Sequence, residues 1–312
     1  NYLMSNILII KLGSLGDIVQ ISGVLRDIRE NHYNKKIFIL TTSPYVELLS
    51  KCPHIDGVLI DKRLPRWNLL YLVKLRKLLS KFNFSKVFDL QNSSRTSFYR
   101  KFLLNNPTWN SSEIAVKRSE KKNNSNNEGV LERFNQQLIY SDIKTKHTLR
   151  PDFSWAAVSV DKIVNQYFGK KFILLFPFCS PQLSHKKWPF YNNLIKILKL
   201  KHPSYEIVIA PSGNEMDEAK KIDATIITKN NNPLNIMELA GLITKASYVI
   251  GNDTGPAHMA AHLGQKGTVL FGYHTTPKKV SIETEKFKAI TVEDLNLLNA
   301  EEVYAAVKNK LN

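Results

Sequence analysis

Short hydrophobic runs alternate with amphipathic segments along most of the chain. Ile7 to Ile10 is a continuous apolar run, the pattern of a strand buried in a parallel sheet. A helix should follow, because apolar residues then recur at helical spacing, at Ile18, Ile21, Leu25 and Ile28. The same alternation predicts strands at 36–40, 58–60, 86–90, 172–176, 206–210, 225–227, 248–250 and 268–271. It predicts helices from Ser43 and at 69–82, 94–104, 130–139, 158–168, 191–201, 216–222, 236–244 and 256–263.

The alternation breaks in two places. Residues 109–129 lose all periodicity, and we expect a mobile surface loop there, either a plain disordered insertion or a basic loop that closes over an anionic acceptor. Residues 141–155 are polar and contain Pro151, as expected of a linker. The chain is therefore predicted to form two doubly wound α/β domains, at 1–150 and 151–312, facing each other across a cleft.

Composition narrows the class of protein. The 312 residues are 43% hydrophobic and 23% charged, as in a globular protein with a substantial core. No apolar run approaches the ~18 residues that cross a bilayer, so we expect a cytoplasmic protein. Cys52 and Cys179 lie far apart with no partner pattern, and the sequence predicts neither a disulfide framework nor a metal site.

Positive charge is concentrated in the first half of the chain. Of the net charge of +17, residues 1–150 carry +13, from 25 Lys and Arg against 12 Asp and Glu. Such a field favours an anionic partner, which could be nucleic acid, a phosphorylated glycolipid or the anionic face of a membrane. The alternative is that the charge serves solubility in a lysine-rich sequence.

The segment 247–271 has the pattern of a phosphate-binding turn. A short strand is followed by turn residues from Asn252 to Gly255 and by a helix that we expect to begin at Pro256. A helix N-terminus directs backbone N–H groups and the positive end of its dipole at one spot, which suits a diphosphate. His258 would lie in the first helical turn beside that anion. The alternative is an ordinary strand-to-helix connection with a good cap.

Three other loops should lie at the carboxyl ends of strands, where open α/β sheets bind ligands. Asp17 follows the first strand and could be a helix cap or a catalytic carboxylate. The loop 177–189 holds Ser180, Lys186, Lys187 and Trp188: a lysine there could bind a phosphate, or the lysines could be exposed and the tryptophan part of the core. Glu215 could accept a hydrogen bond from a ribose, or be only a first-turn helix charge.

Three motifs together resemble glycosyltransferase family 9, the ADP-heptose:lipopolysaccharide heptosyltransferases. They are Lys-Leu-Gly-Ser-Leu-Gly-Asp ending at Asp17, Lys-Lys-Trp-Pro beginning at Lys186, and Asn-Asp-Thr-Gly-Pro-Ala-His ending at His258. Phe271-Gly272 followed by Thr275, Thr276 and Pro277 adds to the likeness, which covers nearly the whole chain. The resemblance implies a GT-B fold, metal-independent inverting transfer and an acceptor bound by the N-terminal half.

The resemblance also implies roles for individual residues. Asp17 matches the proposed catalytic base, Lys186 the lysine near the donor phosphates, and Asp253, Thr254, Gly255 and His258 the donor motif. We place Ser180, Lys187 and Glu215 with the donor as well. Gly13, Ser14, Gly16, Lys117 and Arg118 are assigned to the acceptor. The 109–129 loop is rich in Asn and Lys and departs from the family pattern, which leaves the acceptor open.

We therefore expect an inverting transferase that needs no cofactor or metal and moves heptose from ADP-heptose to a lipopolysaccharide core acceptor at the inner face of the membrane. One alternative is a transferase of the same fold that uses another nucleotide sugar. Another is a nucleic-acid-binding protein, although no DNA or RNA module is recognisable. A nicotinamide-dependent dehydrogenase is disfavoured, because the third glycine of the dinucleotide fingerprint is missing after Gly13 and Gly16.

Overall fold

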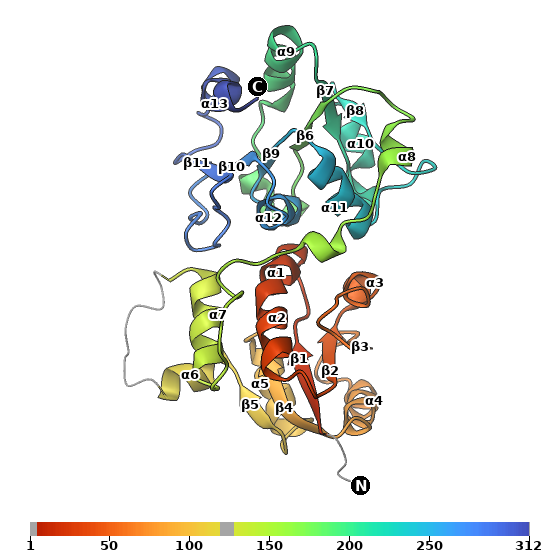
Figure 1. Cartoon of the computed structure of the whole chain (residues 1–312), viewed down its shortest axis with the longest axis vertical. Coiled ribbons are helices and arrows are strands. Elements are labelled where there is room, and N and C mark those ends of the chain that lie inside the picture. The colour runs from red at the N-terminus through yellow and green to blue at the C-terminus, as the bar shows by residue number, and fades with distance from the viewer. Residues whose placement is uncertain (1–4, 119–127, 312) are drawn as a thin grey trace. The chain divides into compact units, whose positions relative to one another are not determined.

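The computed structural model describes residues 5–118 and 128–311 and separates the chain into two compact units, Asn1–Pro151 and Asp152–Asn312 (Figure 1). The division falls within the predicted linker at 141–155. Each unit contains one parallel sheet with helices between successive strands, as the alternation predicts. Among the described residues, no helix is long and apolar enough to cross a membrane.

The N-terminal unit is built on a five-stranded parallel sheet in the order β3-β2-β1-β4-β5. The register pairs Ile7 with Ile37 and Ile10 with Asp89. The strands are β1 Asn6–Ile10, β2 Ile37–Thr41, β3 Gly57–Ile60, β4 Phe84–Asp89 and β5 Thr108–Asn110. The helices are α1 Leu15–Gln20, α2 Ser22–Asn31, α3 Val46–Leu49, α4 Leu69–Ser80, α5 Ser94–Phe102, α6 Ser112–Arg118 and α7 Val130–Ile139, with a short η1 at Ser43–Tyr45.

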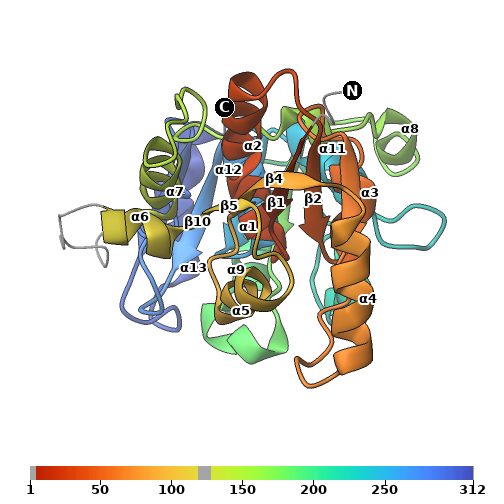
Figure 2. The ribbon, with the colours of Figure 1, turned by 90° about the horizontal axis from the view of Figure 1, so that it is seen from below.

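Helices α4 and α5 cover one face of this sheet, and α2 and α7 cover the other (Figure 2). One buried cluster joins the sheet to α4. It contains Leu8 and Ile10 of β1, Leu12 just after β1, and Leu72 and Leu75 of α4. Leu79 is buried too, whereas Phe82 is only partly buried. The side of α4 that carries Leu72, Leu75 and Leu79 therefore faces the core.

A buried carboxylate fastens the end of this unit to α2. Asp27 is 0% exposed, and its oxygens accept hydrogen bonds from the backbone N–H groups of Lys146, His147 and Thr148 at 2.8 to 3.1 Å and from the Thr148 hydroxyl at 2.7 Å. The chain passes so close to α2 that a Cβ on Gly23 would lie 2.1 Å from the His147 carbonyl oxygen. Residues 146–148 are thus part of the N-terminal unit.

The C-terminal unit has a six-stranded parallel sheet in the order β11-β10-β9-β6-β7-β8. The strands are β6 Phe172–Phe176, β7 Glu206–Ile209, β8 Thr225–Ile226, β9 Tyr248–Asn252, β10 Gly267–Phe271 and β11 Phe287–Thr291. The helices are α8 Asp161–Val164, α9 Tyr191–Lys201, α10 Met216–Ala219, α11 Ile236–Lys245, α12 Gly255–His262 and α13 Ala300–Val307. Short 3-10 turns lie at η2 Ser154–Ala156, η3 Pro181–Lys186, η4 Gly213–Glu215 and η5 Lys308–Lys310.

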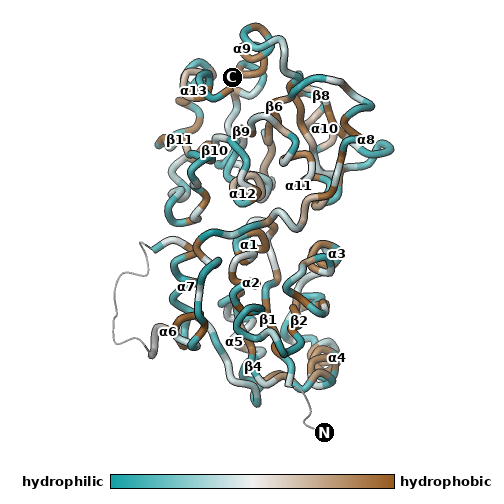
Figure 3. Tube along the Cα trace, in the orientation of Figure 1, coloured by the Kyte–Doolittle hydropathy of each residue, from teal (hydrophilic) through white to brown (hydrophobic). Residues whose placement is uncertain are grey.

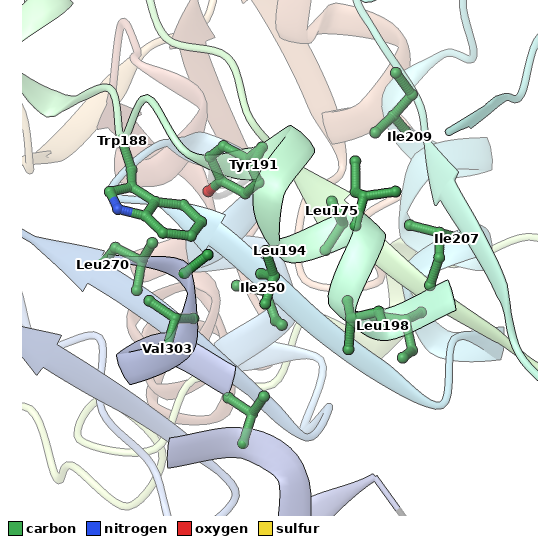
Figure 4. Close-up of a cluster of buried hydrophobic side chains, with 14 of the residues drawn as sticks. Leu175, Trp188, Tyr191, Leu194, Leu198, Ile207, Ile209, Ile250, Leu270 and Val303 are labelled. Carbon is green, nitrogen blue, oxygen red and sulfur yellow. The ribbon is translucent and has the colours of Figure 1, made fainter. Parts of the chain in front are cut away.

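Trp188 lies at the centre of the C-terminal core. Its side chain is 0% exposed and packs among Tyr191, Leu270 and Val303 (Figure 4). The indole N–H donates to the Leu298 carbonyl oxygen at 2.7 Å, so burying the ring leaves no polar atom unpaired. Of the two roles considered for Trp188, the structure shows the core tryptophan.

Two local predictions are wrong. Residues 109–129 do not begin as a loop: Trp109 is buried in the edge strand β5, and α6 follows it. A three-residue strand is too short to show periodicity. The helix predicted at 158–168 is reduced to Asp161–Val164. Its first residues, 158–160, lie outside the helix, and the Val158 N–H donates to the Met237 carbonyl oxygen of α11 at 3.3 Å.

Candidate active site

Three loops meet at the carboxyl edge of the C-terminal sheet. The strands β6, β9 and β10 are neighbours, and because they are parallel, the loops that follow them lie at one edge. Lys186 comes from the loop after β6, Asp253 follows β9 directly, and His274 lies on the loop after β10. Residues that are far apart in the sequence are brought together in this way.

Asp253 is the centre of this cluster. Its side chain is 2% exposed, and its carboxylate lies 2.9 Å from Lys186 Nζ, 3.0 Å from His274 Nε2 and 3.5 Å from His258 Nε2. The Lys186 ammonium also lies 3.4 Å from the Asp253 carbonyl oxygen. The carboxylate therefore holds one ammonium and two imidazoles together, and these three groups, rather than Asp253 itself, are suited to contact an anion.

The ionisation of this cluster follows from its burial and its partners. Burial opposes a charge on Asp253, but the hydrogen bonds and charges of His258 and Lys186 outweigh it and hold the pKa of that carboxyl well below its usual range. Burial lowers the pKa of His274, although Asp253 acts in the opposite direction. At neutral pH we therefore expect Asp253 to be an anion and His274 to be neutral.

The helix α12 begins beside Asp253. Thr254 is its N-cap, and its carbonyl oxygen accepts from the N–H groups of Ala257 at 3.0 Å and His258 at 3.2 Å. The helix starts at Gly255, one residue before the predicted Pro256. The first N–H groups of a helix have no partner within it, and the helix dipole is positive there, so this end favours a phosphate. His258 lies in the first turn, as predicted.

A buried amide fixes the loop that carries Lys186. Asn252 Oδ1 accepts from the backbone N–H of Trp188 at 3.2 Å and from the Tyr191 hydroxyl at 3.0 Å. Its Nδ2 donates to the Phe178 carbonyl oxygen at 3.3 Å. The last residue of β9 thus holds both ends of the 177–189 loop, which places Lys186 over Asp253.

The other residues predicted at the donor have local structural partners. Lys187 forms an ion pair with Glu218 of α10 and is not part of the Asp253 cluster. Glu215 Oε2 accepts from the Ser212 N–H at 2.8 Å and so caps its own helix, the alternative considered for it. Ser180 precedes η3, and its carbonyl oxygen accepts from the Leu183 N–H at 2.8 Å. Their contacts with a donor stay predictions.

In the N-terminal unit, Asp17 lies in the first turn of α1 after β1. Its Oδ2 accepts from the Ser14 N–H at 2.7 Å and from the Ser14 hydroxyl at 3.1 Å, and the side chain is 40% exposed. Asp17 is therefore a capping residue and is also accessible to a ligand. Gly13 has a φ of +124°, and a Cβ there would lie 2.7 Å from Tyr45 Cε2, so this turn requires glycine. Gly16 is buried within α1.

Two residues of these sites were missed by the sequence analysis. Lys11 is 5% exposed, and its Nζ lies 3.6 Å from Asp17 Oδ1 and donates to the Leu90 carbonyl oxygen at 3.2 Å. Burial lowers the pKa of Lys11 against the opposing effect of Asp17. A lysine directly after an apolar strand was the available signal. His274 was the other missed residue, and a lone histidine in a loop gave no signal.

Two of the residues assigned to the acceptor have no described side chains. Lys117 and Arg118 end α6, but their side chains lie outside the described residues. Within 5–118 and 128–311, one trio has ligand atoms close enough to share a metal ion, Asp27, Glu30 and His147. Asp27 already accepts the backbone hydrogen bonds described above, so the trio has a structural role without an ion.

Comparisons with known proteins agree with this arrangement. A model of glycosyltransferase family 9 (heptosyltransferase) matches residues 72–300. The chain is 24% identical over 285 residues to lipopolysaccharide core heptosyltransferase OpsX of Haemophilus influenzae, covering 85% of this chain and 78% of that protein. It is 26% identical over 294 residues to lipopolysaccharide heptosyltransferase 1 of Campylobacter coli, covering 85% and 83%. The structure of E. coli heptosyltransferase WaaC with ADP superposes with a TM-score of 0.75 at 15% identity, covering 98% and 99%.

Two parallel α/β units, with Lys186 held by Asp253 beside a helix N-terminus in the second, and the likeness to WaaC define a glycosyltransferase of the GT-B fold. Because the family match spans more than half of its residues, the chain belongs to glycosyltransferase family 9 (heptosyltransferase). The predicted family, fold class and enzymatic activity are thereby confirmed. The expected roles of single residues are not tested by these likenesses.

Proposed function

We propose that this enzyme transfers heptose from ADP-heptose to a lipopolysaccharide core acceptor, with inversion at the sugar and without a metal ion. Membership of the family supports heptosyl transfer. The names of both relatives support a lipopolysaccharide acceptor, and the ADP-bound structure of WaaC supports an adenine nucleotide.

The observation that carries the proposal is the cluster held by Asp253. Departure of the sugar leaves negative charge on the diphosphate. Lys186, 2.9 Å from Asp253, is held where the N-terminus of α12 also favours an anion. Electrostatic stabilisation of a leaving group by such fixed donors is a large contribution in a preorganised site. The ammonium and the helix end would supply the charge that a metal ion supplies elsewhere.

Asp17 is the proposed general base. It would take the proton from the acceptor hydroxyl as that oxygen forms its bond to the anomeric carbon. The bond from that carbon to the ADP oxygen breaks, and ADP leaves with the electron pair. Attack opposite to the leaving group inverts the configuration. A 40% exposed carboxylate in the first turn of α1, which follows β1, is accessible for this step.

The two units would divide the substrates. The C-terminal unit, with α12, binds the donor, and the N-terminal unit, with Gly13, Ser14 and Gly16 around Asp17, binds the acceptor. The excess of 25 basic over 12 acidic residues in 1–150 suits an anionic glycolipid. We place the enzyme in the cytoplasm, at the inner face of the cytoplasmic membrane.

The test is a comparison of nucleotide sugars with a purified core acceptor. ADP-heptose should release ADP and add one heptose to the acceptor by mass, with the opposite anomeric configuration by NMR and with activity retained in EDTA. UDP- and GDP-sugars should give at least ~100-fold lower kcat/KM. Preferential turnover of another nucleotide sugar would replace heptose transfer with the same reaction on a different donor.

A further inference from the structure

An exposed apolar patch covers the start of α4. Trp67, Leu69, Leu70 and Val73 are 80%, 71%, 77% and 64% exposed. In Figure 3 the hydrophobic colour is pronounced along α4. Single exposed hydrophobic side chains are ordinary on a protein surface, but four within seven consecutive positions form a continuous patch, which marks an interaction site.

The loop that carries Trp67 is held in place by hydrogen bonds. Arg95 Nη1 donates to the Leu64 carbonyl oxygen at 3.0 Å, and the Asn68 N–H donates to that of Pro65 at 3.0 Å. Asn68 Oδ1 then accepts from the Tyr71 N–H at 3.0 Å and caps α4. Exposure of the patch is therefore a fixed feature of the fold and does not come from a loose segment.

Positive charge surrounds the patch. The chain between Asp61 and Asp89 holds eight Lys and Arg residues and no Asp or Glu. Arg76 and Lys77 are exposed one helical turn beyond Val73, and about two turns beyond Leu69 and Leu70. Across the described parts of the chain, no carboxylate forms an ion pair with any basic residue of 62–81, so this charge is available to an anionic partner.

We propose that this surface, residues 62–81, docks on an anionic lipid bilayer. Tryptophan prefers the membrane–water interface, and apolar residues flanked by Lys and Arg are the pattern of an interfacial helix on acidic lipids. A second copy of the chain is a poor partner. A two-fold contact would place the same basic residues of both copies together.

The location of the patch connects it to the reaction, and this step rests on the proposed function. The loop 61–68 follows β3 and the Asp17 loop follows β1, with β2 between these parallel strands. Both loops therefore lie at the carboxyl edge of one sheet. A bilayer held at α4 would present the sugar head of a lipid-anchored acceptor at the edge that carries Asp17.

Vesicle binding of the full chain tests the proposal. The probe is vesicles of phosphatidylethanolamine and phosphatidylglycerol, with pure phosphatidylcholine as the neutral comparison. The enzyme should sediment with the anionic vesicles, and binding should weaken steeply with salt. Trp67 is the tryptophan to follow, because it is 80% exposed, whereas Trp109 and Trp188 are buried and Trp155 is partly buried. Its emission should shift to the blue on binding, and Trp67→Phe should lose most of that shift while binding is kept.

Variants separate the patch from the rest of the surface. Leu69→Ser/Leu70→Ser/Val73→Ser should weaken vesicle binding at least ~10-fold. Arg76→Gln/Lys77→Gln should do so by about 10-fold or more. The matched controls are Leu200→Ser/Leu297→Ser, which alters residues 76% and 79% exposed in the other unit, and Lys308→Gln/Lys310→Gln; both should bind as the unaltered enzyme does. Circular dichroism verifies that each variant is folded.

Two results would overturn the docking surface. One is unchanged vesicle binding by the folded triple-serine variant. The other is concentration-dependent self-association by sedimentation velocity that this variant abolishes, which would make the patch a contact between copies. Transfer to a delipidated, water-soluble core oligosaccharide should be the same in the variant and the unaltered enzyme. If neither protein transfers heptose to that oligosaccharide while the unaltered enzyme still binds anionic vesicles, the proposed function is rejected and the docking surface stays in place.

Discussion

Lys186 Nζ lies 2.9 Å from the carboxylate of Asp253, a side chain that is only 2% exposed. Removing the lysine alone leaves a buried anion with histidine partners, so Lys186→Met should destabilise the protein more than it does in an Asp253→Asn background. We expect a coupling energy of about 1–3 kcal/mol from urea unfolding of the four proteins.

The control for this cycle is an exposed pair at the same distance. Lys220 and Asp217 are also 2.9 Å apart, but their side chains are 67% and 95% exposed. Lys220→Met and Asp217→Asn should therefore be additive within error, because water screens the pair. Additive effects at Lys186 and Asp253 as well would mean that the buried carboxylate does not hold the lysine.

Gly255 begins α12, where the proposed diphosphate must approach the backbone. Gly255→Val should weaken ADP binding at least ~10-fold, since a β-branched side chain obstructs that approach. Isothermal titration calorimetry with ADP measures this. Gly169→Val is the matched control, because nothing lies within 4 Å of a Cβ added at Gly169. Unchanged ADP affinity in folded Gly255→Val would place the diphosphate elsewhere.

Asp17→Asn separates capping from catalysis. The Ser14 N–H donates to the Asp17 carboxylate at 2.7 Å in the unaltered protein, and an asparagine oxygen can accept the same hydrogen bond. The melting temperature should therefore change little. Loss of the base should lower kcat by roughly 10²–10⁴-fold, with ADP affinity retained. Asp217→Asn, in the first turn of α10, is the control and should leave kcat unaltered. Near-normal turnover by the Asp17 variant would show that this carboxylate only caps α1.

His262 should make the C-terminal unit sensitive to acid. It lies in α12 with 5% exposure, and burial together with the charge of His258 lowers its pKa to about 3. The unfolded chain, with a histidine pKa of about 6.5, then binds the proton first. Stability is thus retained above pH 6.5 and lost as the pH falls toward 3, by about 2 kcal/mol between pH 6.5 and 5.

Unfolding of the C-terminal unit by urea at several pH values measures this dependence. His262→Gln should lower the slope of the unfolding free energy against pH by the equivalent of about one proton. His202→Gln, which alters a partly exposed histidine of the same unit, should leave that slope unaltered. An unaltered slope in the His262 variant would assign the acid sensitivity to another histidine of the same unit, such as His274, whose pKa is also lowered by burial.

Most strands were predictable because each is a short apolar run within a sheet buried on both faces, but the edge strands β5 and β11 were not predicted. The pattern at 172–176 and at 130–139 coincides with β6 and α7 residue for residue. Prediction was wrong where contacts from elsewhere decide the structure. Trp109 joins the sheet only because β4 offers an edge, and residues 158–160 lie outside a helix where the Val158 N–H donates to the Met237 carbonyl oxygen of α11.

The residues of the candidate site likewise fall into those predictable from the sequence and those decided by contacts from elsewhere in the fold. Lys186, Asp253 and His258 belong to motifs that are visible along the chain, and the structure brings them together. His274 could not be found, since its contact with Asp253 depends on the adjacency of β9 and β10. Lys187 and Glu215 were plausible from position alone, but their side chains already bind Glu218 and the Ser212 N–H. Proximity in sequence to a site does not decide where a long side chain turns.

The anchoring of residues 146–148 by Asp27 sets the minimum length of an N-terminal fragment that keeps this unit intact. A fragment cut before Lys146 would remove all four of the hydrogen-bond donors described for Asp27, a side chain that is fully buried in the intact unit, and so lose the contacts that compensate its charge. An excised N-terminal module, or a chimera that joins it to a different donor-binding half, should therefore extend at least through Thr148. The crossover point for such exchanges lies in the few residues between Thr148 and the first turn of the second unit at Ser154.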